Sequence, residues 1–566
     1  MTIKYVLFLI NLIFCLQNIH AQAERETRAV WISTNYRLDW PPPSYDEQTQ
    51  KNELIKILED IERKNLNTIY FQVRSNGTVL FKSSFDPFSS YITGEVDLMG
   101  SYDPLKFAIE EAHKRGLEIH AWINSMRSFN SSEVSILEND KHVYKRHPYW
   151  LYSKNEENGS ISLWLNPGLP EVREYLIGLI NELVGNYDID GVQLDFIRYP
   201  QEPIDDHDSY EIYGNGENID DWRRQNINAF VTDLNKKIKS TKPLIKLGVT
   251  PIGIYKNLPN ARGLEGYSDI FQDSREWLKL GVIDYIVPQV YWNINENPQF
   301  KYLVEDWNIN SFGKNVVIGT AAYKQSVNKE LNEQIEITRS KKSSGVAFFR
   351  YSNIKNIEFN KFKEKALPAK MPWIIPKENL PAIALTINDS ATQKNSIKIS
   401  LELEGESDEA KYITLYEISN IRNEKAQRLL DVLPISSTST TISVNIPTNV
   451  IYNYTAKSVD RLWNESGEYN IVSYKVPELK EVNSQIAKFD KPLLTKINNQ
   501  HYLMFCSEED DHINIKVSTT NKELSFVSSH NVFPGLNSLE VGSDVLNYNI
   551  IQLEFANSKR VVELKK

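Results

Sequence analysis

The sequence predicts a (β/α)₈ barrel followed by one or two small all-β sandwich domains. Between residues 24 and 367, short runs rich in β-branched and aromatic residues alternate with segments of helical hydrophobic period, which is the pattern of a parallel α/β fold. These runs number eight, the strand count of a closed barrel. No glycine-rich phosphate turn follows the first strand, so a doubly wound open sheet is the weaker alternative.

Local signals mark the elements of the first half of the predicted barrel. Leu54, Leu58 and Ile61 recur at the spacing of one helix face. Asp103 precedes Pro104, which predicts an N-cap followed by proline at the first helical position. The expected strands cover residues 28–34, 68–75 and 117–124, and the expected helices cover 47–64 and 104–115.

Residues 190–200 form the fourth expected strand, which carries a carboxylate near its end. Its apolar residues alternate with Gln193 and Asp195, so these two polar side chains share one face. A buried unpaired carboxylate is costly or becomes protonated. Asp195 is therefore either a structural acid, paired with Arg198 or a backbone N–H, or a functional one. The place of this strand in a barrel favours the functional role.

The alternation continues on both sides of this strand. Helix 170–185 leads into it and helix 219–239 follows it. The remaining strands are expected at 245–252, 284–292, 316–323 and 345–351, with helices at 270–280 and 329–341.

The barrel is expected over residues 24–367. Composition predicts the kind of structure in the segments that follow it. Prolines mark a linker over 368–381. Residues 382–477 show short alternating runs, among which Ile451–Ser466 resembles the late strands of a fibronectin type III sandwich. Residues 478–566 are expected to form a further all-β domain. Neither region carries a catalytic constellation, so both are expected to support the barrel or to attach it to glycans or a surface.

The N-terminus predicts export. Lys4 precedes an apolar run over residues 5–16, and Ala21 and Ala23 provide small residues at cleavage spacing, so residues 1–23 are expected to be a signal peptide. The destination would be the periplasm, the cell surface or the medium. Lipid attachment at Cys15 is the lesser alternative because Phe14 before it is bulky. Cleavage would leave Cys506 alone and exclude an intramolecular disulfide.

Charge and composition narrow the classes of partner. The net charge of −10 gives no electrostatic case for nucleic acid, and no later segment is apolar enough to span a membrane. No HxH, HExxH or clustered acidic pattern indicates a metal, and no cofactor is expected. Eleven Trp and 29 Tyr suit the flat faces of sugar rings, so a carbohydrate partner is favoured. The oligomeric state stays open.

Candidate site residues lie where barrel enzymes place them, at the C-terminal ends of strands and in the loops that follow. Asp195 is the expected general acid or base, with Tyr291 as a second catalytic candidate. Together the polar and aromatic residues at this rim favour a ligand with many hydroxyl groups. The expected substrate-binding residues are Asp39, Trp40, Gln72, Arg74, Trp122, Asn124, Gln193, Arg198, Tyr199, Gln289, Trp292 and Arg350.

Glycoside hydrolysis normally needs two carboxylates, and the second one is not evident from the sequence. Strands six to eight end without an acid. The loop carboxylates that could reach the site are Asp39, Asp86, Glu95, Asp269 and Asp273. A substrate acetamido group acting as nucleophile would remove the need for a second acid, and Tyr291 and Gln289 would then orient that group.

Seven segments along the barrel resemble the bacterial glycosyl-hydrolase-like family 10 in sequence and in order. They are Arg28–Ile32, Leu38–Pro41, Phe71–Arg74, His113–Asn124, Leu165–Gly168, Asp190–Pro200 and Val287–Trp292. The resemblance implies a (β/α)₈ glycosidase, exported, with bacterial cell-wall or other N-acetylated glycans among its substrates. This chain departs from many relatives in one respect: they carry two adjacent acids on strand four, and here the second position is Phe196.

The fourth strand also looks like the family 18 chitinase pattern DGxDxDxE. Asp190 and Asp195 match that pattern, whereas Gln193 replaces the middle acid and Ile197 replaces the catalytic glutamate. Three hypotheses follow. The favoured one is an exported glycoside hydrolase with Asp195 as general acid or base. The alternatives are a non-catalytic glycan-binding protein that retains the barrel cleft, and a surface scaffold whose β domains bind.

Overall fold

The computed structural model describes residues 25–565 with gaps at 131–132, 157–158, 376–378, 388–395, 422–423, 444–450, 468–469, 476–491, 498–499, 508, 519–523 and 534. The chain divides into two compact units, Met1–Pro376 and Lys377–Lys566. The predicted signal peptide and Cys15 lie outside the described residues. No helix in the described part of the chain is both long and apolar enough to cross a membrane.

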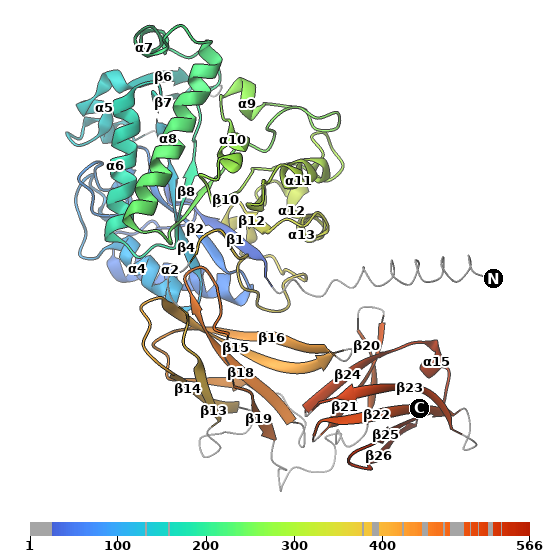
Figure 1. Ribbon diagram of the computed structural model, residues 1–566. Helices are drawn as coiled ribbons and strands as arrows, with labels where there is room; N and C mark the ends of the chain where they lie inside the picture. The colour runs from blue at the N-terminus through green and yellow to red at the C-terminus, as the bar shows by residue number, and fades with distance from the viewer. Residues whose placement is uncertain are drawn as a thin grey trace. The chain divides into compact units, whose positions relative to one another are not determined.

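The first unit contains a closed parallel barrel, which confirms the predicted fold class (Figure 1). Each barrel strand pairs in parallel with the next, and β1 pairs with both β2 and β12, so the sheet has no free edge within the barrel. In barrel order the strands are β1 (Thr27–Ile32), β2 (Thr68–Ser75), β4 (Glu118–Asn124), β8 (Gly191–Asp195), β9 (Lys246–Val249), β10 (Tyr285–Ile286), β11 (Asn315–Thr320) and β12 (Gly345–Phe348).

Helices surround the barrel because their apolar faces pack onto it. In α2, the Asp46 side chain accepts a hydrogen bond from Thr49 N, and Leu54, Leu58 and Ile61 are buried against the sheet. Asp103 caps α4 in the same way before Pro104. The outer helices are α2 (Glu47–Arg63), α4 (Pro104–Lys114), α6 (Pro170–Asn186), α8 (Ile219–Thr241), α10 (Ser274–Lys279), α11 (Phe300–Ile309) and α13 (Leu331–Ser340).

Several elements are shorter than the sequence predicts. The strand expected over 190–200 ends as β8 at Asp195, because the next residue, Phe196, has a φ of +50° that interrupts the extended backbone. The strand expected over 284–292 is paired only at Tyr285–Ile286, because Pro288 lacks a donor for the ladder. After Pro288, Gln289 forms isolated β-bridges to Ile252 and Gly319, so the chain stays beside the neighbouring strands as it approaches the rim. The helix expected from residue 270 begins at Ser274, because Phe271 has a φ of +56° that no right-handed helix accepts.

Short elements build the loops of the first unit. A three-stranded antiparallel sheet in the β4–α6 connection has the order β5-β7-β6. The loop elements are β3 (Thr78–Val79), α3 (Ser90–Thr93), β5 (Arg127–Phe129), α5 (Val143–Arg146), β6 (Leu151–Asn155), β7 (Ile161–Leu165), α7 (His207–Tyr213), α9 (Gly266–Asp269), α12 (Gln325–Asn328) and α14 (Tyr351–Ile354). Short 3-10 turns lie at Asn35–Arg37, Val134–Glu138 and Pro148–Trp150.

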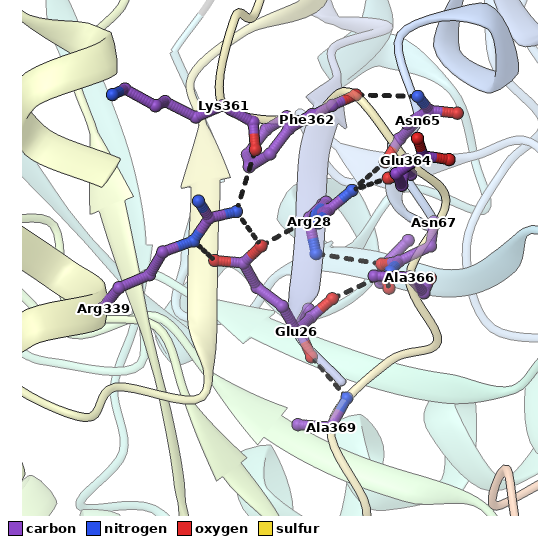
Figure 2. Close-up of polar contacts among 12 residues, drawn as sticks. Glu26, Arg28, Asn65, Asn67, Arg339, Lys361, Phe362, Glu364, Ala366 and Ala369 are labelled. Carbon is purple, nitrogen blue, oxygen red and sulfur yellow. Dashed lines mark hydrogen bonds and ion pairs between the residues drawn. The ribbon is translucent and has the colours of Figure 1, made fainter. Parts of the chain in front are cut away.

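A buried ionic network holds the N-terminal end of β1 to the segment that follows α14 (Figure 2). Glu26 accepts hydrogen bonds from Arg28 Nε at 2.8 Å and from Arg339 Nε at 2.7 Å. Arg28 Nη1 donates to the carbonyl oxygen of Glu364 at 2.7 Å. Asn67 Nδ2 donates to the carbonyl oxygens of Glu26 and Ala366. The first and last parts of the barrel are thereby joined at the end opposite to the C-terminal rim.

The second unit consists of antiparallel sheets. Within the described residues, a three-stranded sheet has the order β13-β14-β17, a seven-stranded sheet has β19-β18-β15-β24-β21-β20 with β16 on β15, and a four-stranded sheet has β23-β22-β25-β26. The bounds are β13 (Ile383–Ile387), β14 (Ser396–Leu403), β15 (Ala410–Ile421), β16 (Glu424–Pro434), β17 (Ser439–Ser443), β18 (Ile451–Asp460), β19 (Val472–Lys475), β20 (Leu493–Ile497), β21 (Gln500–Ser507), β22 (Asp511–Ser518), β23 (Ser525–Val532), β24 (Gly535–Val541), α15 (Ser543–Leu546), β25 (Ile550–Phe555) and β26 (Val561–Lys565).

The seven-stranded sheet combines strands from both sides of residue 477, since β15 pairs in parallel with β24. Cys506 is buried within the second unit and forms no disulfide bond among the described residues. The domain boundaries at 367, 381 and 477 and the fibronectin type III assignment stay predictions.

Candidate active site

Asp195 lies at the C-terminal end of β8, with 7% of its surface exposed. Its Oδ1 accepts a hydrogen bond from the backbone N–H of Phe196 at 2.7 Å, and its Oδ2 accepts one from Trp122 Nε1 at 3.2 Å. Gln289 Nε2 lies 3.5 Å from Oδ1. Asn124, the last residue of β4, is in register with Asp195. Three predicted site residues, Trp122, Asn124 and Gln289, therefore meet at the predicted acid.

Burial raises the pKa of Asp195 above its ordinary value, because the charged form loses its hydration. The Phe196 N–H and the charges of Arg127 and Arg198 oppose this rise without cancelling it. A carboxyl group with a raised pKa keeps its proton to a higher pH than an ordinary aspartate, and proton donation to a leaving group requires that protonated form. The burial of Asp195 thus favours its protonated form.

The raised pKa of Asp195 predicts a pH-dependent stability difference between wild type and Asp195→Asn. A carboxyl whose pKa is higher in the folded state stabilises fully below its ordinary pKa, and this contribution is lost as pH rises through the raised value. Asparagine does not titrate. The melting temperature of the variant minus that of wild type should therefore increase as pH rises from about 4 to about 8, measured by scanning calorimetry. A difference that is constant over this range would contradict the raised pKa.

Two guanidinium groups lie over one aromatic ring beside Asp195. The guanidinium carbon of Arg127, from β5, lies 3.6 Å from the centroid of the Phe196 ring. That of Arg198 lies 5.5 Å from the same centroid and 5.1 Å from that of Trp164. Phe196 has a φ of +50°, which is strained for a bulky residue. This conformation directs its N–H to the Asp195 carboxylate while its ring contacts both arginines.

Glu156 is a second carboxylate near these arginines. It follows β6, and its Oε1 accepts a hydrogen bond from Ser162 Oγ on β7. Burial lowers the pKa of both Arg127 and Arg198, and the negative charges of Glu156 and Asp195 oppose that lowering in each case. Both carboxylates therefore act electrostatically on the same two guanidinium groups. The sequence candidates for the second acid do not include Glu156.

An aromatic wall faces Asp195 from the later strands. Tyr291 packs against Phe349 with ring centroids 5.9 Å apart and against Tyr323 at 6.1 Å. Trp122 meets Phe349 at 6.1 Å. Burial, and then the charge of Asp195, raise the pKa of Tyr291 well above its ordinary value, so its phenol stays protonated and can donate a hydrogen bond. Tyr323 is half exposed and offers a ring face at this rim.

Several predicted binding residues instead hold the loops that frame the site. Gln72 Oε1 accepts hydrogen bonds from Thr34 N at 3.0 Å and from Asn35 N at 2.9 Å. Arg350 Nη1 donates to Asp39 Oδ1 at 2.7 Å, which joins the loops after β12 and β1.

Other predicted binding residues lie beneath the rim. Arg74 is fully buried and forms an ion pair with Asp86 at 2.7 Å. Trp40 and Tyr199 have no exposed surface, and Trp40 Nε1 donates to the carbonyl oxygen of Gln50 at 2.9 Å. Direct substrate contact at these positions stays a prediction.

Gln193 and Trp292 lie close to the barrel interior. Gln193 Oε1 accepts a hydrogen bond from Trp31 Nε1 at 2.8 Å, and the Gln193 Nε2 group is buried with no partner among the described residues. Trp292 is half-buried and packs against the hydrophobic core of the barrel.

The other loop carboxylates considered from the sequence have structural partners or lie exposed. Asp86 pairs with Arg74 and accepts a hydrogen bond from Tyr175, and Asp273 accepts one from Tyr255 at 2.7 Å. Glu95 and Asp269 are exposed. In the part of the chain that the structure describes, no group of three or more His, Cys, Asp and Glu residues could hold a metal ion.

A cavity of about 820 Å³ lies between α4 and α6, lined by residues that include Lys106, His113 and Glu182. None of its lining residues comes from the C-terminal ends of the barrel strands, where the chemistry-bearing groups converge. The candidate active site is therefore the rim around Asp195 and not this cavity.

Comparison with known proteins found a family profile and named relatives that this chain resembles. The profile of the family described as glycosyl hydrolase-like 10 matches residues 26–337. The chain is 32% identical to "Glycosyl hydrolase YngK" of Bacillus subtilis (strain 168) over 486 residues, 79% of this chain and 93% of that protein. It is 32% identical to "Glycosyl hydrolase DigH" of Escherichia coli (strain K12) over 332 residues, 54% of this chain and 74% of that protein. The solved catalytic domain of a β-amylase from Paenibacillus polymyxa aligns with a TM-score of 0.40 at 14% identity, covering 61% of this chain and 98% of that domain.

Proposed function

Because the chain belongs to the glycosyl hydrolase-like 10 family, we propose that it is an exported glycoside hydrolase in which Asp195 is the general acid. The proposed substrate is a polysaccharide or oligosaccharide, with N-acetylated and cell-wall glycans as the first candidates. The observation that carries the proposal is the environment of Asp195. This carboxylate is buried at the end of a central barrel strand, its pKa is raised, and hydrogen-bond donors and aromatic rings converge on it.

The chemistry requires Asp195 to protonate the glycosidic oxygen as the bond to the anomeric carbon breaks. In the resting state Trp122 Nε1 and the Phe196 N–H bind the carboxylate, and they fix its orientation toward the rim. Tyr291, held protonated beside Asp195, can donate a hydrogen bond to a substrate oxygen or to an acetamido carbonyl. Gln289, Asn124 and the exposed face of Tyr323 complete a surface that suits hydroxyl groups and one sugar ring.

A non-catalytic glycan-binding protein is the second candidate function. Phe196 follows Asp195 directly, so this strand ends with a single acid, and this favours a cleft that binds without hydrolysis. The two functions differ in the products that they give.

The test of the proposed function is product analysis. Peptidoglycan glycan strands, chitin oligomers and plant polysaccharides are incubated with wild type and with Asp195→Asn, and new reducing ends are measured by mass spectrometry. We expect wild type, but not Asp195→Asn, to produce new reducing ends from at least one of these glycans. Binding without any new reducing end, over the whole panel, would establish the non-catalytic alternative.

Glu156 is proposed as the second carboxylate of the reaction, as base or nucleophile. Glu156→Gln is then expected to lower kcat by about 10² or more, whereas Glu217→Gln, a change at an exposed residue, is expected to have no effect. If Glu156→Gln keeps wild-type turnover while Asp195→Asn is inactive, the reaction uses a substrate group in place of a second protein acid. Steady-state kinetics on the hydrolysed glycan distinguish these outcomes.

A further inference from the structure

We propose that Arg127 and Arg198 form a subsite for a carboxylate group of the substrate, so that the glycan bound at Asp195 carries acidic sugars. This inference rests on the proposed function in that it places a glycan at Asp195, and it adds a chemical class to that glycan. A uronic acid and a lactyl ether are the two common sugar carboxylates with this chemistry.

The two arginines bring two guanidinium groups together on one aromatic ring. Both guanidinium groups lie within 5.5 Å of the centroid of the Phe196 ring. Among the described residues, no carboxylate forms an ion pair with either of them. Arg198 Nη1 donates to the carbonyl oxygen of Tyr199 at 3.1 Å, and the remaining N–H groups of both side chains form no other hydrogen bond within the described residues. A guanidinium group presents paired N–H donors that match the two oxygens of a carboxylate.

The charge balance of the cluster also favours an anionic ligand. The pKa of Arg198 is lowered to about 10. Burial is the largest cause of this lowering, and the positive charge of Arg127 is the next. When Asp195 is protonated, as a general acid must be, its carboxyl group no longer offsets the positive charge of the two guanidinium groups. A substrate carboxylate would neutralise this excess and would also favour the protonated form of Asp195.

A purely structural role explains the arrangement less well. Arginines that serve only to hold a loop form close ion pairs or multiple backbone contacts, as Arg74 and Arg28 do in this barrel. Arg127 instead rests on an aromatic ring and remains partly exposed. Stacking of this kind fixes the plane of a guanidinium and leaves its N–H edge available to a ligand.

The test compares matched acidic and neutral glycans. Oligogalacturonate and peptidoglycan glycan strands with free lactyl carboxylates are each prepared in native form and after reduction of the carboxylates to alcohols. Affinity is measured by calorimetry with the full-length Asp195→Asn protein, and hydrolysis with the protein that retains Asp195. At least one acidic glycan should bind about tenfold to a hundredfold more tightly than its reduced form. This preference should fall in Arg127→Gln and Arg198→Gln, persist in part in Arg127→Lys, and be unchanged in Arg63→Gln, at an exposed residue of α2.

The outcomes separate this inference from the proposed function. Hydrolysis with equal affinity for acidic and reduced glycans would overturn the carboxylate subsite and leave the hydrolase intact. An acidic preference that depends on Arg127 and Arg198, without hydrolysis of any glycan, would support the subsite and refute the hydrolase. A loss of affinity for acidic and reduced forms alike in the glutamine variants, with unchanged circular dichroism, would also overturn the subsite. The comparison of glycans on the protein with both arginines intact remains informative if a variant fails to fold.

Discussion

Asp195→Asn is expected to lower kcat by about 10²–10⁴-fold, because asparagine cannot donate the proton that the leaving oxygen needs. The change keeps the shape of the side chain and one acceptor oxygen for the Phe196 N–H. The fold should therefore persist while the chemistry is lost. Steady-state kinetics with the glycan that wild type hydrolyses give the measurement, and KM should change much less than kcat.

An aryl glycoside with an acidic phenol provides the decisive control for Asp195→Asn. Such a leaving group departs without protonation, so the variant should regain much of the wild-type rate on it if Asp195 acts as an acid. Asp233→Asn, at an exposed residue of α8, is the matched substitution and should behave as wild type. Equal losses on both kinds of leaving group would show that Asp195 has another role.

The elements that were predictable from the sequence are those fixed by local chemistry. Asp46 and Asp103 cap α2 and α4 because their side chains reach N–H groups three residues ahead, which a sequence pattern can reveal. The bounds of β2 were correct because turn residues flank a short β-branched and aromatic run. The end of β10 was not predictable by alternation alone, since Val290 and Trp292 continue the pattern after Pro288 has ended the ladder.

The candidate site was predictable only where a residue ends a barrel strand. Asp195, Asn124 and Trp122 meet because parallel strands end at one rim. Arg127 and Glu156 come to the same place through the small β5-β7-β6 sheet, whose pairing joins residues far apart in the sequence. The one available signal was the position of Arg127, three residues beyond the end of a predicted strand.

The partners of buried charges also could not be read from the sequence. Arg74 lies near the end of β2 and was expected to bind substrate, but its guanidinium is fully buried against Asp86 and against the carbonyl oxygen of Asn124 at 2.5 Å. Nothing in the local pattern distinguishes it from Arg198, which also follows a strand but remains partly exposed. The difference arises from the loop that carries Asp86 over the barrel.

Arg28→Met is expected to destabilise the barrel by about 3–5 kcal/mol, the usual cost of removing one partner of a buried ion pair. Arg28 has no exposed surface. The substitution would leave Glu26 with only Arg339 as its cation and would remove the donor to the Glu364 carbonyl oxygen (Figure 2). Loss of the helical circular dichroism signal in urea gives the measurement, because nearly all described helices belong to the first unit.

Arg63→Met is the matched control for Arg28→Met, since it removes an arginine whose side chain is 62% exposed and whose partner is Asp60. It should cost less than about 1 kcal/mol, as exposed ion pairs do. A similar small cost for Arg28→Met would mean that the barrel does not depend on this network for closure. The large cost is expected because the buried Arg28 side chain connects β1 both to the carboxylate of Glu26 and to the carbonyl oxygen of Glu364. Weakening this network would expose the ends of β1 and β12, the strands whose pairing closes the sheet.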